Sequence, residues 1–543
     1  MKIALAQLNY RIGDFEQNTN LMYEAITEAR SNGADLVIFS ELAVCGYPPD
    51  DFLDYDWFVE KCEQSMEAVA ECCQGIAAVA GGVLRNRDTG RGLFNVACFM
   101  QNGRIQNMVK KTLLPTYDVF AESRYFEPSD TVEIIEFKGY KIGIAICEDI
   151  WDLYNDFRYE KSPVQALKEA GAQLLIHPSA SPFHVGKIRQ RDKVFAGNAE
   201  RFGLPIIYVN QVGAHADLIF DGDSQVINSK GETVKQLPLF EEAIEYVTLG
   251  NTDFLSLPVH FDEPDEPAII HDALVFGIKD YFRKMGFKKA ILGASGGIDS
   301  AVVQCLATAA LGAENVTAFL MPSPYSSEGS VNDAQKLSEN LGNRYEMLPI
   351  TDMFNAGNNT LKSLFEGSPF GIAEENMQAR IRGLLLMSYS NKFGDILLNT
   401  SNKSEMAVGY STLYGDMCGS LSPIGDVYKS KVYALARFIN RQSEVIPGNI
   451  LSKPPSAELR PGQKDSDSLP DYPVLDEILR FYIDERKGRD EIITHGYDPN
   501  TVDKILKLVN RSEYKRFQAP PILRVSRKAF GRGRNMPLVA WYG

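Results

Sequence analysis

The 543-residue chain is too long for one ordinary hydrophobic core, so two or more domains are expected. Its composition, 44% hydrophobic and 23% charged, is that of a globular protein, and the net charge of -15 argues against a nucleic-acid partner. Eight scattered cysteines without a Cys-x-x-Cys pair indicate a reduced protein. Because no apolar run reaches the roughly 18 residues of a membrane span and no leader pattern opens the chain, we expect a soluble, cytoplasmic protein without membrane partners.

The first half of the chain alternates buried strands with amphipathic helices. Short β-branched runs predict strands at 3–8, 36–39, 76–83, 96–100, 142–146, 174–176 and 206–209. Helical patterns at 18–30 and 189–202 lie between some of them, and 224–247 returns to strands around a turn at Gly231. This mixture predicts an α/β sandwich with mixed sheets.

A proline-rich boundary separates this half from the next. The acidic segment 255–267 carries three prolines, which disfavour helix, and we expect it to link a domain at 1–254 to one at 268–543. A helix at 269–285, a strand at 290–292, a helix through 301–311 and a strand at 317–321 then predict a doubly wound parallel sheet. The polar stretch 452–473 predicts a mobile loop over a site.

A glycine-rich turn joins the strand at 290–292 to the next helix. It consists of Gly293, Ala294, Ser295, Gly296, Gly297, Ile298, Asp299 and Ser300. Glycines let backbone approach a phosphate, the helix start offers free N–H groups, and Asp299 can hold a divalent cation. No Gly-Lys-Ser/Thr follows, which favours a cradle for leaving pyrophosphate over γ-phosphoryl transfer. The alternative is a plain turn with an N-cap serine.

This SGGIDS turn resembles the signature of the ATP-pyrophosphatase family. The segments 371–383, 397–416, 422–437, 453–459 and 512–521 are similar to its NAD synthetase branch. The resemblance implies a Rossmann-like domain that binds ATP through residues 293–300, Thr400, Lys429 and Ser456. It further implies Mg²⁺ at Asp299 and Glu405, and nicotinate adenine dinucleotide (deamido-NAD) at Asn376, Arg380, Glu405 and Lys515. Taken singly, Lys429 could be a solvated helix lysine, Glu405 a surface acid and Asn376 an N-cap.

Three reactive side chains follow predicted strands in the first half. Glu41 comes after 36–39, Lys111 after another strand pattern, and Cys147 after 142–146. Strand ends at one sheet edge are where α/β proteins place such groups. Cys147 would attack a carboxamide, Glu41 would move the proton, and Lys111 would lower the thiol pKa and stabilise the oxyanion. Singly, each residue could have a structural role; we assign Cys45 to packing.

The words around these residues resemble the glutamine-amidohydrolase branch of the nitrilase superfamily. They are IFSELAVCGYPPDD, LLPTYDVFAESRYFEP and CEDIW. The resemblance implies an αββα sandwich, glutamine binding by Tyr117, Ser181 and Lys187, and a Glu122 carboxylate that positions Lys111 or Glu41.

Together the two halves resemble the glutamine-dependent NAD synthetase family. That likeness implies ATP-dependent amidation of deamido-NAD through an acyl-adenylate, with ammonia released from glutamine in the first half. It also implies a homo-oligomer that pairs through synthetase domains, with an octamer as an open alternative. Two other functions stay open at this point: amidation of a different carboxylate, and nucleotide sensing by a scaffold whose amidase half is inactive.

Overall fold

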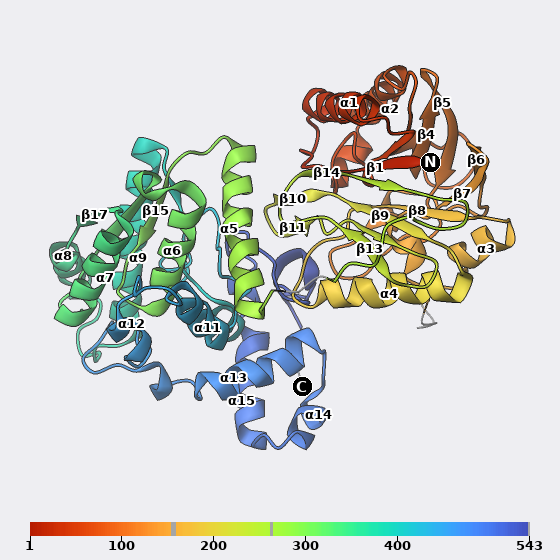
Figure 1. Ribbon diagram of the computed structural model, residues 1–543. Helices are drawn as coiled ribbons and strands as arrows, with labels where there is room; N and C mark the ends of the chain where they lie inside the picture. The colour runs from red at the N-terminus through yellow and green to blue at the C-terminus, as the bar shows by residue number, and fades with distance from the viewer. Residues whose placement is uncertain (154–158, 261–263, 541–543) are drawn as a thin grey trace. The chain divides into compact units, whose positions relative to one another are not determined.

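Figure 1 shows the computed structural model, which describes residues 1–153, 159–260 and 264–540. The chain forms two compact units. The first comprises Met1–Gly213 and Phe220–Glu263; the second comprises Ala214–Ile219 and Pro264–Gly543. Part of the predicted linker, residues 261–263, lies outside the described residues, and the linker remains a prediction.

The first unit contains two six-stranded mixed sheets. One has the order β14 (Ala243–Thr248), β1 (Lys2–Gln7), β2 (Leu36–Ile38), β3 (Ala77–Arg85), β4 (Leu93–Gln101), β5 (Arg104–Lys110). The other has the order β13 (Thr233–Gln236), β12 (Gln225–Ile227), β9 (Ile206–Asn210), β8 (Leu174–Ser179), β7 (Tyr140–Ile144), β6 (Ile134–Phe137). In each sheet the three strands β1–β3 or β7–β9 run parallel, and their outer neighbours run antiparallel.

The two sheets share one apolar layer. Alternate side chains of each strand point inward, so Leu5 and Ile38 of one sheet meet Ile144 and Ile176 of the other in a single buried cluster. Helices α1 (Phe15–Ser31) and α2 (Asp56–Glu71) cover the first sheet, and α3 (Pro163–Glu169) and α4 (Lys187–Phe202) cover the second (Figure 1). This arrangement confirms the predicted αββα sandwich.

The second unit is built on a four-stranded parallel sheet in the order β17 (Arg344–Met347), β16 (Val316–Leu320), β15 (Ala290–Gly293), β18 (Ile396–Leu397). The chain leaves β15 toward β16 on one side and returns to β18 on the other. The order therefore reverses at β15, and the crevice at the carboxyl end of such a strand is where doubly wound sheets bind ligands. The predicted doubly wound fold is confirmed.

Helices surround this sheet and extend beyond it. They are α5 (Glu266–Met285), α6 (Ile298–Leu311), α7 (Glu328–Leu341), α8 (Thr351–Leu361), α9 (Ile372–Phe393), α10 (Lys403–Val408), α11 (Lys429–Ile439), α12 (Gly448–Ser452), α13 (Tyr472–Leu479), α14 (Arg489–Thr494), α15 (Pro499–Arg511) and α16 (Glu513–Arg516). A separate apolar cluster holds α10, α13 and α15 together, with Leu475 and Val502 among its fully buried members.

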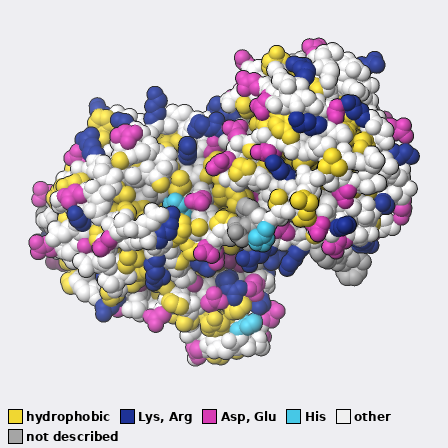
Figure 2. Space-filling model, in the orientation of Figure 1, with side chains coloured by type: hydrophobic (Ala, Val, Ile, Leu, Met, Phe, Trp, Pro, Cys, Tyr) yellow, Lys and Arg dark blue, Asp and Glu magenta, His cyan; other side chains and the backbone are white. Residues whose placement is uncertain are grey.

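The surface carries charges of both signs. Acidic and basic side chains are interspersed over much of the face in Figure 2, in a chain whose formal net charge is -15. Within the described residues, no helix is both long and apolar enough to cross a membrane.

Candidate active sites

A buried lysine between two carboxylates forms the centre of the first unit's site. Lys111 directly follows β5, and its side chain is fully buried. Its Nζ donates to Glu41 Oε1 at 2.7 Å and to Glu122 Oε2 at 2.7 Å. Burial opposes the charge of Lys111, but the two carboxylates outweigh it, so its pKa lies well above its ordinary value. The ammonium ion is therefore retained.

Glu41 collects donors from both sheets. Asn95 of β4 donates to Glu41 Oε1 at 2.7 Å, and the backbone N–H of Ala180, directly after β8, donates to Oε2 at 3.1 Å. Burial raises the pKa of Glu122 to about 7, although Lys111 pulls it down, and the Tyr47 hydroxyl donates to it at 2.9 Å. The structure thus brings the predicted Glu41, Lys111 and Glu122 together.

Cys147 begins the short helical turn after β7. Its φ of 44° lies in the left-handed region, which is uncommon for a residue other than glycine. Burial, reinforced by Glu41, raises the pKa of the thiol well above its ordinary value, although Lys111 acts in the lowering direction. Lys111 thus acts in the predicted direction, but the net shift of the thiol pKa is upward. The resting group is a neutral thiol, which needs a base.

Sequence reasoning missed the residue that joins the lysine segment to the cysteine turn. Asp149 accepts the N–H groups of Thr112 and Leu113 at 3.1 and 2.7 Å and the N–H of Ile146 at 2.9 Å. Its carboxylate therefore fixes the residues that follow Lys111 against those that precede Cys147. The only sequence signal was an acid two residues after the cysteine.

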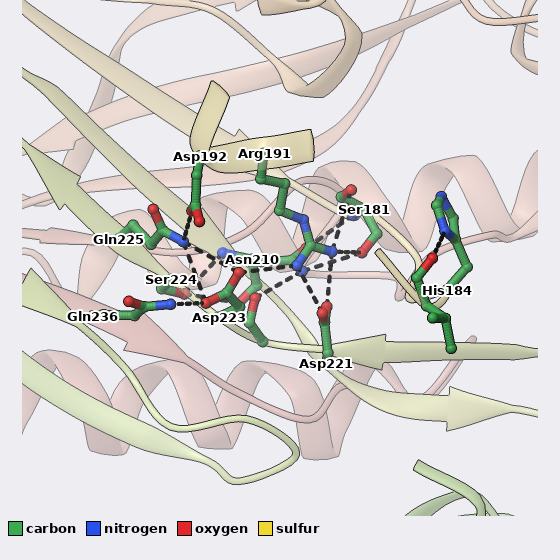
Figure 3. A network of polar contacts seen from close by, with 12 residues as sticks. Ser181, His184, Arg191, Asp192, Asn210, Asp221, Asp223, Ser224, Gln225 and Gln236 are labelled. Carbon is green, nitrogen blue, oxygen red and sulfur yellow. Dashed lines mark hydrogen bonds and ion pairs between the residues drawn. The ribbon is translucent and has the colours of Figure 1, made fainter. Parts of the chain in front are cut away.

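Two of the residues predicted to bind glutamine lie near the same turn. The Tyr117 hydroxyl donates to Glu148 at 2.8 Å, next to Cys147, and the Lys187 ammonium lies 3.8 Å from the centre of the Trp151 ring. Burial is the main cause that lowers the pKa of Lys187 to about 7. Ser181 is buried, and its N–H donates to Asn210 Oδ1 at 2.9 Å (Figure 3). Glu148 had not been predicted.

The glycine-rich turn of the second unit forms one wall of a cavity at the carboxyl end of β15. Helix α6 starts at Ile298, so its first N–H groups have no helical acceptor. Ser295 Oγ accepts the N–H of Gly297 at 3.1 Å, and Ser300 Oγ donates to Gly297 O at 3.0 Å, so both hydroxyls brace the turn. All of residues 293–300 except Gly296 line the cavity, together with Thr400, Glu405, Lys429 and Ser456.

A lysine lies between the two acids predicted to bind metal. Lys429 Nζ is 2.5 Å from Asp299 Oδ2 and 3.2 Å from Glu405 Oε1. Burial raises the pKa of Glu405 to about 8 against the opposing effect of Lys429. Asn402, which sequence reasoning missed, donates to Asp299 Oδ1 at 2.9 Å. Asp299, Glu405 and Lys429 thus form one charged group inside the cavity.

The predicted loop at 452–473 closes another side of this cavity, which its residues Lys453–Leu459 and Asp465 line. Ser456 Oγ donates to Gln463 O at 2.6 Å within the loop. Glu458, at a φ of 49°, accepts hydrogen bonds from Ser327 Oγ at 2.9 Å and Ser330 Oγ at 2.7 Å, at the start of α7. The loop is therefore fastened to the sheet domain over the site.

The remaining residues predicted for deamido-NAD contact a neighbouring loop. Asn376 accepts from Thr412 Oγ1 at 2.8 Å, Arg380 Nε donates to Leu413 O at 3.2 Å, and Lys515 Nζ donates to Gly409 O and Ser411 O, each at 2.7 Å. These three side chains are not part of the cavity wall formed by the glycine-rich turn. They surround residues 409–413, which directly follow α10 and its Glu405.

Comparison with known proteins agrees with both halves. The carbon-nitrogen hydrolase family model matches residues 2–252, and the NAD synthase family model matches residues 270–519. A glutamine-dependent NAD(+) synthetase from Synechocystis sp. is 45% identical, over 99% of this chain and 98% of the relative. This chain belongs to the glutamine-dependent NAD(+) synthetase family.

Two further relatives agree with this membership. The glutamine-dependent NAD(+) synthetase from Thermotoga maritima is 40% identical over 99% of this chain and 98% of its own length. The solved structure of the Acinetobacter baumannii enzyme of the same description, in complex with ADP, is 38% identical. It matches with a TM-score of 0.80 over 99% of this chain and 98% of its own.

The close packing of Gly296 gives a testable prediction. Its φ is 76°, and a Cβ there would lie 2.1 Å from Ser330 O, so Gly296→Ala must displace the turn. We expect a loss of about 1–3 kcal/mol in unfolding free energy and weaker nucleotide binding. Thermal unfolding and calorimetric ATP titration measure the two effects.

The matched control is Gly286→Ala. Gly286 has a φ of 74°, but a Cβ there meets nothing within 4 Å, so this variant carries the backbone strain without the clash. Wild-type ATP affinity in Gly296→Ala would contradict the assignment of this turn to the nucleotide.

Proposed function

We propose that this chain makes NAD by ATP-dependent amidation of deamido-NAD, with ammonia that its first unit releases from glutamine. The observation that carries the proposal is the presence, in one chain, of a buried glutamate–lysine–cysteine site and a glycine-rich nucleotide turn at a sheet switch point. Full-length relatives that carry both activities in their name support it. The inactive-scaffold alternative is not favoured, because the three reactive residues are present and adjacent.

In the first unit, Cys147 would form a thioester with the glutamine side chain. Its sulfur bonds to the amide carbon while Glu41 takes the thiol proton. The proton passes to the leaving nitrogen, the carbon–nitrogen bond breaks, and ammonia departs. Lys111 remains charged and stabilises the oxyanion. Water then hydrolyses the thioester to glutamate.

The charged groups near Cys147 are complementary to those of free glutamine. The substrate carries one ammonium and one carboxylate group, and this site offers the Glu148 carboxylate and the Lys187 amine, whose charges influence each other. Tyr117 orients Glu148 through its hydroxyl. We assign Tyr117, Ser181 and Lys187 to glutamine binding, with Glu148 as an added partner.

In the second unit, the nicotinate carboxylate of deamido-NAD would attack the α-phosphorus of ATP and release pyrophosphate. Ammonia then attacks the acyl-adenylate carbon, and AMP leaves. Residues 293–300, Thr400, Lys429 and Ser456 would bind ATP, while Asn376, Arg380, Glu405 and Lys515 would bind the dinucleotide. The ADP complex of the A. baumannii relative supports nucleotide binding in this fold.

Asp299 and Glu405 fit a magnesium ion. Carboxylate oxygens are its preferred protein ligands, and the Lys429 ammonium already lies between these two, as a cation of the protein's own. A bound Mg²⁺ would neutralise charge on the leaving pyrophosphate. Lys429 and the N–H groups of α6 would share that work by binding phosphate oxygens.

Replacement of the nucleophile should separate the two reactions. Cys147→Ala leaves no thiol, so glutamine-dependent NAD formation should fall at least about 1000-fold. Synthesis with ammonium chloride should continue, because the second unit keeps its own site. NAD formation with each nitrogen source is the measurement.

Cys45→Ala is the matched control for this experiment. Cys45 is also buried, four residues after Glu41, and its thiol donates to Leu42 O at 3.6 Å. It should keep both activities. Loss of ammonium-dependent synthesis in Cys147→Ala would show that the two reactions do not separate in this way.

Replacement of the Asp299 carboxylate, a proposed magnesium ligand, should stop NAD synthesis from either nitrogen source. In Asp299→Asn, one anionic ligand is lost, so Mn²⁺ binding in the presence of ATP, followed by electron paramagnetic resonance, should weaken by at least about tenfold. Glu266→Gln serves as control, since Glu266 pairs with Lys431 at 2.8 Å on the exposed side of α5. Normal Mn²⁺ binding by Asp299→Asn would refute the metal assignment.

We further propose that the chain forms a homo-oligomer through the α8–α9 region. Large apolar side chains are exposed there, which is unusual for a free surface: Leu364 (76%), Phe370 (47%), Ile372 (75%), Leu384 (57%) and Phe393 (62%). A second copy of the same face would cover them. We also place the chain in the cytoplasm, because all eight cysteines are free and the nucleophile must stay reduced.

A charge placed on this face should break the assembly. Leu364→Glu combined with Ile372→Glu would bury repelling carboxylates in the contact, and light scattering after size-exclusion chromatography should show a smaller species. Val539→Glu, at a position 95% exposed outside this region, should leave the mass unchanged. An unaltered mass for the double variant would rule out this face.

A further inference from the structure

An arginine that the proposed chemistry does not use lies buried beneath the glutamine site. Arg191 belongs to α4, one helical turn after Lys187, and its side chain is completely inaccessible to solvent. Its two Nη atoms donate to Asp221 at 2.7 and 2.8 Å, and Nη1 also donates to Asp223 at 3.2 Å (Figure 3).

The same guanidinium reaches the segment that carries Ser181. Arg191 Nη2 donates to Ser181 O at 3.0 Å and lies 3.5 Å from its hydroxyl. Asn210, the last residue of β9, also holds this segment. It accepts the Ser181 N–H at 2.9 Å and donates to Ser181 O at 3.2 Å and to Gly222 O at 2.9 Å. Figure 3 shows these side chains converging on Ser181.

Stability alone does not account for this arrangement. A buried ion pair loses so much hydration that well-packed apolar residues are often as stable in its place. Here the planar guanidinium does what an apolar residue cannot, because its donors join three segments at fixed angles. Those segments are the N-terminal half of α4, the residues after β8, and the end of β11 (Leu218–Asp221) with Asp223.

We propose that Arg191 is a positioning residue for glutamine, which fixes the spacing between Ser181 and Lys187. This inference rests on the proposed glutamine-binding role of those two residues. Lys187 and Arg191 occupy positions i and i+4 of one helix, so their side chains lie on the same face. The Arg191 guanidinium also donates a hydrogen bond to Ser181 O. After burial, the charge of Arg191 is the next cause that lowers the pKa of Lys187, consistent with their closeness.

The proposal predicts a specific kinetic effect. Arg191→Lys keeps the positive charge, but an ammonium group cannot hold Asp221 in a bidentate pair and also reach Ser181 in the guanidinium's geometry. The KM for glutamine should therefore rise at least about tenfold, with kcat at saturating glutamine changed by no more than about threefold. Ammonium-dependent synthesis should not change, since it does not use glutamine.

Matched variants make the test decisive. Arg201→Lys changes an exposed arginine of the same helix, whose Nη1 contacts Leu153 O at 3.3 Å, and should leave the glutamine KM unchanged. Asp223→Asn is the second variant in case Arg191→Lys does not fold. It keeps the shape of the side chain but turns one acceptor of Arg191 into a donor, and should raise the KM in the same direction.

Ser181→Ala and Lys187→Met distinguish the two ways in which the idea can fail. A raised KM in these variants, with a wild-type KM in both Arg191→Lys and Asp223→Asn, would overturn the positioning role and leave the glutamine site standing. A wild-type KM in Ser181→Ala and Lys187→Met would overturn the glutamine site itself. Equal losses of glutamine- and ammonium-dependent activity in Arg191→Lys would reduce its role to general stability.

Discussion

The first unit depends on the pairing of one buried cation with two buried carboxylates. An unpaired ammonium ion inside a protein loses its hydration without compensation, so Lys111 can be buried only while Glu41 and Glu122 stay within hydrogen-bond distance. Glu41 in turn accepts from Asn95 in one sheet and from Ala180 beside the other. The requirement to pair Lys111 thus fixes the ends of strands from both sheets relative to one another.

That constraint also bears on the proposed role of Cys147 as the nucleophile. Burial, and after it the charge of Glu41, raises the pKa of the Cys147 thiol well above its ordinary value, which favours the protonated thiol at rest. In the proposed reaction, Glu41 would remove the proton as the sulfur attacks. The strained φ of Cys147 and the Asp149 clamp hold the thiol at the end of β7. We infer that accurate placement of the Cys147 thiol promotes its attack, as thiolate formation would in a more exposed site.

Sequence patterns predicted the parts of this structure that follow local rules. Strand runs such as 206–209 and the turn at 293–300 were recognisable because apolar periodicity and glycine spacing are written in neighbouring residues. The sequence reasoning did not name β6 or α2, and it placed the end of β7 two residues late. Asn95, Asp149, Arg191 and Asn402 could not be found, since each acts on a residue distant in the sequence.

The two sites use a lysine between carboxylates in different ways. Lys111 is enclosed by partners whose side chains are 0% and 5% exposed, so its ammonium group stays paired with them. Lys429 also bridges two acids, but Asp299 and Glu405 are each 17% exposed and line a cavity. In the proposed function, the Lys429 ammonium would balance the acids before an anionic nucleotide binds, and its flexible four-carbon chain would let it follow the phosphates. In the proposed reactions, the lysine–carboxylate pairing would stay closed at the site that moves a proton and would open at the site that binds phosphates.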